Sequence, residues 1–516
     1  MSEPRLGGDV KGAFALGVVA TLVATFVNDG VVAWLLSPVF VGCFLYAAAR
    51  APLRYSIYVL TFCALAVEKP TEMPPWTSPF FPIGTLMFLH IKHMTGVSIF
   101  FLSGMEYLLI FLLGVSLLRE STGSSIDARG RVETPRPFVK LAYVSLAGSM
   151  FTWMYGIATG GDFSKSLWQL EKVIYVPIVF LLCNRGLRGP KDHAVLGKIV
   201  LVAAALRSIL AIYVVHVTAE RDPETGELLL EHATSHHDSM LFAFASLLLV
   251  LMVIERADKK ALRRLLLIQP LYVWGMIAND RRMVWVQIGL VLVTLYLVTP
   301  PNVVKRKIKR ALIALSPAIA GYVAAGWSSE ASIFKPVGII RSVVEPDTDA
   351  SSLWREIENY DILYTFRRAP IFGHGYGHPF WEVIPLPAVP YELEHYCPHN
   401  SILGLWAFAG FVGFTMLVLL WAGGVFFAMR AYFATKVPTE RVAAVLAVGS
   451  VIIYMIQCYG DMGLGAWTGV FLVAPCLSLA GKLAVHAGAW NRPKTRASRP
   501  PPATRATREG RAVPAQ

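Results

Sequence analysis

The sequence predicts an all-α polytopic membrane protein with about 12–14 transmembrane helices and one large, partly helical loop on the outer side. Of its 516 residues, 55% are hydrophobic and 16% are charged, whereas soluble domains carry about a quarter charged residues. The apolar residues recur in blocks of about 17–25, the length of helix that crosses a bilayer core. The basic residues gather in alternate loops between these blocks, which is typical of a multi-pass chain.

The apolar blocks follow one another along most of the chain and define the expected helices. They lie near residues 11–27, 31–49, 55–67, 97–118, 138–158, 171–185, 194–217, 239–255, 265–278, 283–300, 311–327, 401–429, 441–459 and 466–486. A further stretch, 78–91, is shorter and flanked by prolines. We interpret it as re-entrant or interfacial, because it is short for a membrane span.

Basic residues indicate which side of the membrane each loop occupies. The basic loops are those with Arg50 and Arg54, Arg119 to Arg136, Arg185 to Lys191, Arg256 to Arg264, Lys305 to Arg310, and Arg430 to Arg441. The intervening loops are neutral or acidic, so the positive-inside rule puts both termini in the cytoplasm. The net charge of +13 is therefore explained by the lipid bilayer as partner, and no nucleic acid is expected.

The same reading divides the chain into four parts. They are transmembrane helices over 1–327, a periplasmic loop over 328–399, further transmembrane helices over 400–490, and a disordered basic cytoplasmic tail over 491–516. The loop is the only outer stretch long enough for a subdomain. We therefore expect it to carry the chemistry.

Helical spacing of apolar residues predicts an amphipathic helix over 351–367 of the large loop. Its apolar positions are Leu353, Ile357, Tyr360 and Tyr364. Pro370 ends this helix. A turn with Gly373, Gly375 and Gly377 follows, and it either needs positive φ angles or brings the backbone close to a sugar or phosphate. No strand precedes it, so it is not a dinucleotide-binding fingerprint.

His399 lies where the loop meets the next membrane helix. Pro398 stops the preceding segment, and Asn400 or Ser401 can cap the helix. The helix dipole favours an anion at this end and disfavours imidazolium. His399 is therefore expected to stay neutral and able to accept a proton, although a histidine here can also be a simple cap or surface residue.

Several basic residues are candidates for binding an anion. Arg281 and Arg282 stand between two helices on the outer face, where they either pair with Asp280 and lipid headgroups or form a fork for pyrophosphate. Arg207 lies within an apolar block, so it needs a buried partner. Lys92 stands near the outer end of the short stretch 78–91 and is a further candidate.

A histidine cluster occurs in another outer loop. It consists of His232, His236, His237 and Asp238. The spacing can suit a metal, but neither an HExxH motif nor a cysteine partner accompanies it. We therefore predict no metal site and interpret His237 as a polar loop residue or a substrate contact.

Taken together, these motifs resemble the O-antigen ligase and O-antigen polymerase superfamily. The matching residues, spanning about 280–415, are Arg281 or Arg282, Arg355, Pro370 with Gly373 and Gly375, His399 with Asn400, and Gly410 with Gly413. The stretch 160–180, GGDFSKSLWQLEKVIYVPIVF, also has the look of the family. At the first arginine the family usually has Ser-Arg-Gly, whereas this chain has Asp-Arg-Arg-Met, so the aligned arginine stays open between Arg281 and Arg282.

The resemblance implies a GT-C-like enzyme of the bacterial inner membrane. Such an enzyme transfers a glycan from undecaprenyl pyrophosphate to an acceptor hydroxyl on the periplasmic side, with inversion and without metal or cofactor. The acceptor would be lipid A core for a ligase, or a growing lipid-linked chain for an O-antigen or exopolysaccharide polymerase.

The resemblance also implies roles for single residues: His399 would be the catalytic base, and Arg281, Arg282 and Arg355 would bind the pyrophosphate. From their own positions in the sequence, Lys92 and Arg207 are further candidates for binding the pyrophosphate. The candidates for loop or acceptor contacts are Gly373, Gly375, Asn400 and His237.

A second class of function is a transporter or flippase of lipid-linked glycans. It predicts inverted repeats and ionisable residues at the membrane midplane. The sequence has no internal repeat, and its outer charges stand at the membrane face apart from Arg207. A sensor or scaffold would not need the histidine and arginine constellation. The enzyme is therefore the favoured class.

Overall fold

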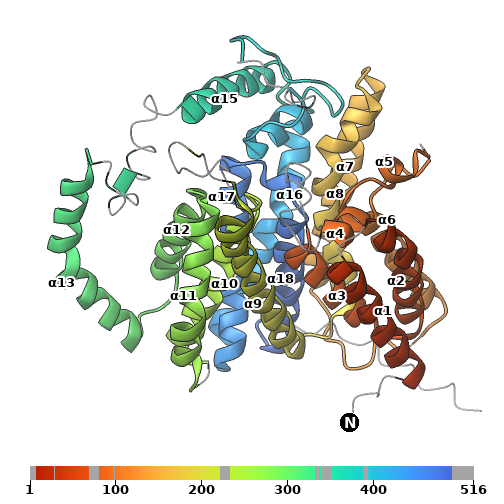
Figure 1. Ribbon diagram of the computed structural model, residues 1–516, viewed down its shortest axis with the longest axis horizontal. Coiled ribbons are helices and arrows are strands. Elements are labelled where there is room, and N and C mark those ends of the chain that lie inside the picture. Colours follow the sequence, from red (N-terminus) through yellow and green to blue (C-terminus); the bar gives the residue numbers. More distant parts are fainter. Residues whose placement is uncertain are drawn as a thin grey trace, which may run out of the picture.

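The computed structural model describes residues 7–490, except 28, 29, 69–80, 98, 125, 221, 222, 224–232, 258 and most of 330–349 and 387–394. Within these residues the regular elements are helices, and no strand is formed beyond one isolated bridge between His90 and Ser103. The predicted all-α fold class is therefore confirmed (Figure 1). The tail 491–516 and His232 lie outside the described residues.

Seven described helices are long and apolar enough to cross a bilayer, so the chain is a multi-pass membrane protein. They are α7 (Arg136–Ala158), α8 (Phe163–Gly186), α9 (Pro190–Tyr213) with its extension Val214–Thr218, α13 (Val303–Gly326), α16 (Ser401–Ala434), α17 (Pro438–Gly460) and α18 (Trp467–His486). Shorter apolar helical segments are Leu35–Arg50 of α2 (Gly30–Arg50), α3 (Leu53–Ala66), α10 (Asp238–Ile254) and α12 (Met283–Val298).

Helix α18 forms the centre of the bundle. Its apolar window is 94% buried, and it packs against α3, α8, α16 and α17. Its first turn is capped from outside, because the Glu68 carboxylate accepts hydrogen bonds from the backbone N–H groups of Trp467 (2.9 Å) and Thr468 (2.7 Å). The Glu68 carbonyl in turn accepts a hydrogen bond from Arg207. One residue thus joins the early and late halves of the chain.

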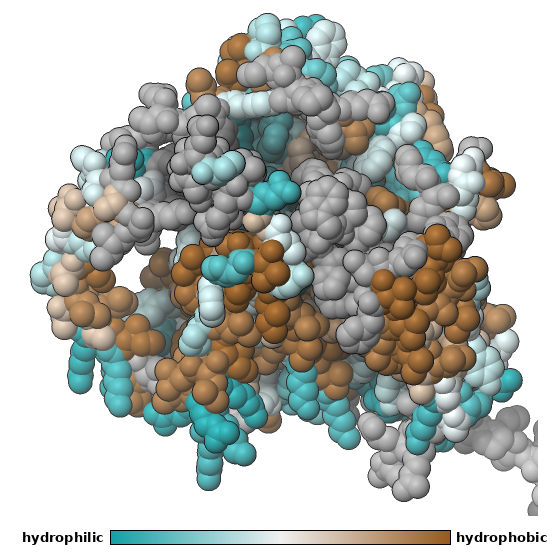
Figure 2. All heavy atoms as spheres, viewed as in Figure 1, coloured by the Kyte–Doolittle hydropathy of each residue, from teal (hydrophilic) through white to brown (hydrophobic). Residues whose placement is uncertain are grey.

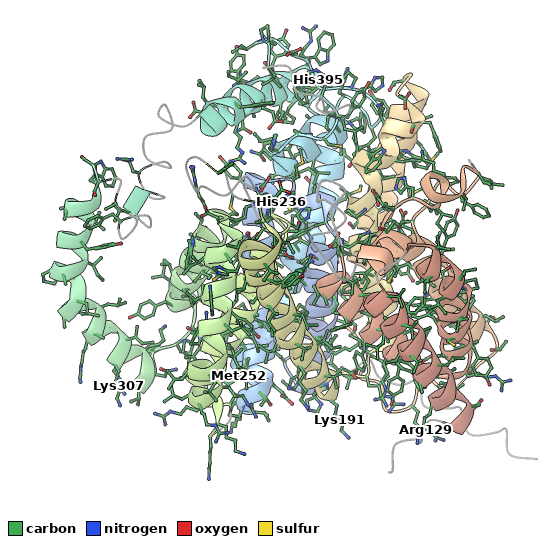
Figure 3. All side chains as sticks on the ribbon, in the orientation of Figure 1. Arg129, Lys191, His236, Met252, Lys307 and His395 are labelled. Carbon is green, nitrogen blue, oxygen red and sulfur yellow. The ribbon has the colours of Figure 1, made fainter. Side chains whose placement is uncertain are left out.

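The two ends of the bundle differ in charge. Arg129, Lys191 and Lys307 lie at one end of the bundle, and His395 lies at the opposite end (Figure 3). A broad apolar belt separates the two ends, and long hydrophilic side chains extend from the basic end (Figure 2). This arrangement is the one that the positive-inside rule produces.

The remaining helices lie around this bundle. Helices α1 (Gly8–Val27), α2, α4 (Phe81–Phe88) and α6 (Gly104–Ser121) pack together on one side, with α5 (Ile91–Thr95) nearby, and α11 (Ala261–Asn279) lies against α9 and α10. The eight residues of α4 rise about 12 Å, which is too short to cross a core of about 30 Å. Helix α4 is therefore too short to span the membrane, in line with the expectation that the 78–91 stretch is not a full membrane span; residues 78–80 lie outside the described part.

Helix α13 stands apart from the bundle (Figure 1). Its membrane-length window, Lys305–Gly326, is 0% buried, and Leu312, Ile313 and Leu315 are more than half exposed. Among the described residues little packs against the membrane-length part of α13, so its exposed apolar face suits an apolar environment such as the acyl chains of a bilayer.

The expected loop helix exists as α15 (Ala350–Arg368), but the predicted apolar face was wrong. Leu353 and Tyr360 are about half exposed, whereas the buried positions are Glu358, Asp361, Ile362 and Thr365. The buried polar groups hold the following loop: Asp361 accepts hydrogen bonds from the N–H groups of Val383 and Ile384, and Thr365 accepts one from Trp381. Three of these four buried positions are polar, so apolar spacing alone did not find this face, although Ile357 of the predicted face does pack against the core.

Helix α16 is broken at Gly410, where φ is 59° and ψ is −167°. In an unbroken helix the N–H groups of Phe411 and Val412 would bond the carbonyls of Ala407 and Phe408. Instead they donate to the carbonyls of Pro370 and Ile371, at 2.9 and 3.1 Å.

The freed carbonyls are also satisfied by the loop. Ala407 accepts from His374 N–H at 2.7 Å, and Phe408 accepts from Gly375 N–H at 3.0 Å. The segment 370–375 therefore replaces both helical hydrogen bonds that the break removes, and it fixes the loop to the membrane helix.

This pairing predicts a high cost for any side chain at the break. A Cβ on Gly410 would lie 2.3 Å from Gly373 N and 2.5 Å from Ile371 O. Gly410→Ala should lower the free energy of unfolding by at least about 1–3 kcal/mol, the cost of a strained backbone, measured by thermal unfolding in detergent.

Gly289→Ala is the matched control, because Gly289 lies within α12 and nothing surrounds its Cβ position within 4 Å. Alanine there should be neutral or gain about 0.5–1 kcal/mol. Equal melting temperatures for both variants would show that the break is not constrained.

Candidate functional site

His399 lies directly before α16, against the polar face of α15. Its Nδ1–H donates to the Glu358 carboxylate at 3.2 Å, and its backbone N–H donates to the same carboxylate at 3.1–3.2 Å. The side chain of Glu358 is 2% exposed, whereas that of His399 is 32% exposed. The buried carboxylate thus orients the imidazole and leaves Nε2 as its free ring nitrogen.

Glu358 also changes the protonation of His399. Burial alone lowers the pKa of this histidine, but the hydrogen bond and the negative charge of Glu358 outweigh burial and raise the pKa above its ordinary value. The expectation that the helix dipole keeps His399 neutral was therefore wrong in direction. The dipole argument considered only α16, and the carboxylate comes from a different helix.

Other charged groups surround His399. The charge of Arg355, on the same face of α15 as Glu358, opposes imidazolium, and the charge of Asp461 favours it. The backbone carbonyl of His399 accepts a hydrogen bond from Met462 N–H at 2.7 Å. His399 is thereby held between α15 and the turn after α17.

His237 belongs to the same region. Burial and His236 hold the pKa of His237 well below its ordinary value, Asp461 acts in the opposite direction, and Arg281 lowers it further. Asp461 therefore acts electrostatically on both His399 and His237. The structure brings His399, Arg355, His237 and Arg281 together around the Asp461 turn.

The remaining predicted cations occupy different positions. Arg282 is exposed whereas its neighbour Arg281 is half-buried. Arg207 is 3% exposed, and its guanidinium pairs with Asp238 at 2.9 Å, which supplies the partner that the sequence required. Lys92 lies on α5, and the neighbouring His90 rather than Lys92 lines the cavity described below.

Three other predicted residues are engaged in the fold. Asn400 caps α16 as expected, accepting a hydrogen bond from Leu403 N–H at 3.1 Å, and it donates to Asn359. Gly373 and Gly375 have φ angles of +77° and +95°. Their backbones contact α16 and, at Gly375, Gly156 of α7. Of the two alternatives for this turn, the positive φ is observed, and the close approach is to protein backbone.

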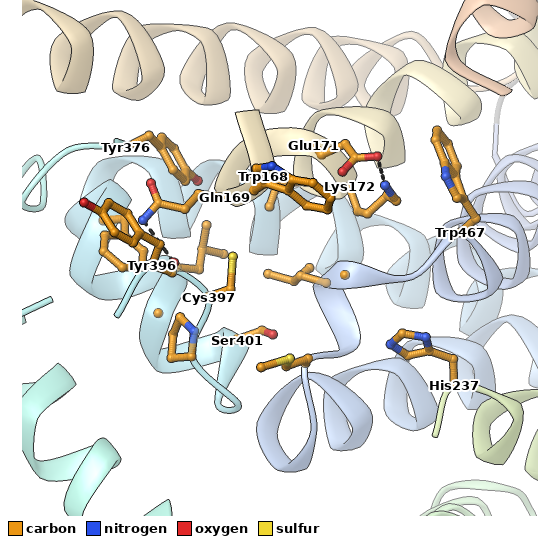
Figure 4. Close-up of a pocket in the computed structure, with 18 of the residues that line it drawn as sticks. Trp168, Gln169, Glu171, Lys172, His237, Tyr376, Tyr396, Cys397, Ser401 and Trp467 are labelled. Carbon is orange, nitrogen blue, oxygen red and sulfur yellow. Dashed lines mark hydrogen bonds and ion pairs between the residues drawn. The ribbon is translucent and has the colours of Figure 1, made fainter. Parts of the chain in front are cut away.

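A cavity of about 410 Å³ opens beside this region, between α8, α16 and the start of α18. Figure 4 shows its labelled lining residues, which are Trp168, Gln169, Glu171, Lys172, His237, Tyr376, Tyr396, Cys397, Ser401 and Trp467. Aromatic rings alternate here with groups that form hydrogen bonds. His399 is not part of the lining, but Pro398 and Ser401 on either side of it are.

A group with metal-ligand spacing lies next to this cavity. Ligand atoms of His90, Glu106 and Glu171 fall within 4.8 Å of one another. Lys172 forms an ion pair with Glu171. The Lys172 ammonium therefore supplies positive charge to one carboxylate of this group. In the predicted histidine cluster, Asp238 is paired with Arg207 instead, and the rings of His236 and His237 contact each other.

Sequence reasoning missed three residues that organise the site. Glu358 and Asp461 act on His399 as described above. Gln169 of α8 accepts from Gly377 N–H and donates to the carbonyls of His378 and Tyr396 at 3.0 Å. A glutamate at helical spacing i+3 from Arg355 was a usable signal for Glu358. Gln169 lies in the stretch 160–180 that has the look of the family, whereas nothing local marked Asp461.

The raised pKa of His399 predicts a titration that depends on Glu358. Glu358→Gln keeps an acceptor for the backbone N–H but removes the charge, so the midpoint for His399 should move to lower pH. Diethyl pyrocarbonate modifies neutral imidazole, and mass spectrometry of the modified peptide as a function of pH gives the midpoint. His216, on the extension of α9, is the internal control, and an unchanged His399 midpoint would contradict the role of Glu358.

Part of this chain is similar to a known protein family. No curated protein matches the chain. Residues 267–418 match the family model described as O-antigen ligase. This segment contains Arg281, Arg355, Glu358, His399 and the break at Gly410, and the family implies glycosyl transfer. The match over residues 267–418 is thus to the same family that the sequence motifs resemble.

Proposed function

We propose that this protein is a glycosyltransferase that moves a glycan from undecaprenyl pyrophosphate to an acceptor hydroxyl, with His399 as catalytic base. The observation that carries the proposal is the hydrogen bond between His399 and the buried carboxylate of Glu358, within the segment that matches the family. A carboxylate that fixes the tautomer and raises the basicity of an imidazole is the arrangement that general-base catalysis requires.

The proposed reaction is a single displacement. Nε2 of His399 takes the proton of the acceptor hydroxyl while its oxygen forms a bond to the anomeric carbon. The bond from that carbon to the pyrophosphate oxygen breaks, and the pyrophosphate leaves with the electron pair. Because the hydroxyl attacks from the face opposite the leaving group, the anomeric centre inverts.

The leaving group needs positive charge where its own negative charge develops. Arg281 and Arg355 are the proposed partners of the pyrophosphate, since both act electrostatically in the region of His237 and His399. A guanidinium suits phosphate oxygens by its planar, forked geometry. Arg282 is proposed to remain at the membrane surface because it is exposed.

The cavity is proposed to receive sugar residues. Trp168 and Trp467 offer flat apolar faces, and Gln169, Lys172 and Glu171 offer groups that bind hydroxyls. Apolar faces with a few placed polar groups are typical of small-molecule sites. We propose that this end of the bundle faces the periplasm of a bacterial inner membrane, opposite the end that carries Arg129, Lys191 and Lys307.

Reconstitution with a lipid-linked oligosaccharide tests the function directly. A product that forms only with added lipid A core would identify a ligase, and a ladder of lengthening lipid-linked chains would identify a polymerase. Movement of the donor across the bilayer without any product would instead support a transporter and refute the proposal.

His399→Ala should lower the rate of transfer by about 10²–10⁴, the contribution of a general base, without loss of membrane insertion. His216→Ala, in the extension of α9, is the control and should keep full activity. Transfer at the wild-type rate by the His399 variant would remove this residue from the mechanism.

The neighbouring arginines form a matched pair. Arg281→Ala should reduce transfer by about 10² or more, the effect of losing one group that stabilises developing charge, whereas Arg282→Ala should retain most activity. Initial rates with saturating acceptor measure both. The reverse order of effects would assign the pyrophosphate to Arg282.

The proposed mechanism uses no metal ion, so transfer should continue in EDTA. The assay compares rates in EDTA with rates after addition of Mg²⁺ or Mn²⁺. Loss of transfer in EDTA that either metal restores would contradict the mechanism and direct attention to His90, Glu106 and Glu171.

A further inference from the structure

A second hollow lies in the membrane part of the protein, between α10, α11 and α12. Its volume is about 560 Å³. The lining is apolar except for Ser246 and Gln269, and these two bind each other at 2.9 Å. Gln269 Oε1 is the one buried oxygen of the described lining left without a hydrogen-bond partner. The rest of the groove is apolar and suits a hydrocarbon chain.

The groove runs along the helices rather than across them. On α11 its lining extends from Leu265 to Met276, a distance of about 17 Å at 1.5 Å per residue. On α12 it begins at Trp285. This length is about half of a bilayer core of about 30 Å.

One end of the groove lies next to the turn that carries Arg281 and Arg282. Helix α11 ends at Asn279 and α12 begins at Met283, so Arg281 and Arg282 connect the two helices that line the groove. Met276 and Trp285 lie within five residues of Arg281 on either side. A molecule with its phosphate at Arg281 and its tail directed into the membrane would follow the groove.

Access to this side of the bundle is from the bilayer. Helix α13 follows α12 in the chain but stands away from it, and Figure 2 shows an open space between α13 and the body of the protein. Leu266 is 65% exposed and Trp285 is 37% exposed. A lipid chain can therefore reach the groove sideways, without crossing a layer of protein.

We propose that the groove between α10, α11 and α12 binds the polyprenyl chain of the lipid-linked donor, in its part nearest the pyrophosphate. This inference rests on the proposed function for the identity of the donor. The tail gains no hydrophobic energy by moving from acyl chains into an apolar groove. Its contribution is orientation, because a held tail directs the pyrophosphate to Arg281 and the sugar toward the cavity beside His399.

The groove can be filled with a larger side chain. Val273→Trp and Leu292→Trp occupy the space of the tail. Each should raise the KM for an undecaprenyl-linked donor about tenfold, as expected for overpacking of an occupied apolar site. The same glycan on a dimethylallyl pyrophosphate, which carries a single isoprene unit, should be used equally well by wild type and variants, because that chain is too short to fill the groove.

Leu290→Trp is the matched control. Leu290 lies on α12, is 49% exposed and is not part of the groove. Its KM for both donors should be unchanged. An equal increase in KM for long and short donors in the groove variants, or no increase for either, would overturn the proposal.

Direct labelling makes the proposal independent of transfer. A polyprenyl phosphate that carries a diazirine on its first isoprene units should label the groove residues of α11 and α12 in wild type, and Val273→Trp should abolish this labelling. Labelling spread equally over α13 and α1 would overturn the inference. Labelling of the groove by a protein that transfers no glycan would retain the lipid site and refute the proposed function.

Discussion

The break in α16 at Gly410 is the constraint on which the site depends. A helix that loses two backbone hydrogen bonds inside a membrane protein must replace them, because water is scarce there. The segment 370–375 replaces both, with donors and acceptors from its own backbone. The loop is thus bonded to the membrane helix as firmly as one turn of that helix is bonded to the next.

The position of His399 follows from this attachment. With the glycine turn fixed against α16 and α7, α15 lies over the end of the bundle (Figure 1). Its buried face then meets the returning chain, and Glu358 holds both the backbone and the ring of His399. Gln169 secures the same loop from α8. The imidazole is therefore oriented by Glu358 of α15, and α8 and α16 hold the loop to which His399 belongs.

The sequence was informative where one local rule governs the structure. Long apolar blocks predicted the helices, Asn400 predicted the cap of α16, and the spaced glycines predicted positive φ. It failed where a distant residue decides. The buried face of α15 is polar because it binds a loop, and the pKa of His399 is raised because Glu358 approaches from another helix. The partner of Arg207, Asp238, is 31 residues away in the chain, and no periodicity connects the two.

The cap of α18 by Glu68 has a consequence for biosynthesis. Trp467 follows Glu68 by 399 residues, so the carboxylate is made long before the backbone groups that satisfy it. Until the last helix is inserted, Glu68 has a buried position without those donors, which is costly. A chain that is truncated or stalled before α18 therefore keeps a polar defect at its centre. Such a defect is what membrane quality-control proteases can distinguish from a complete protein.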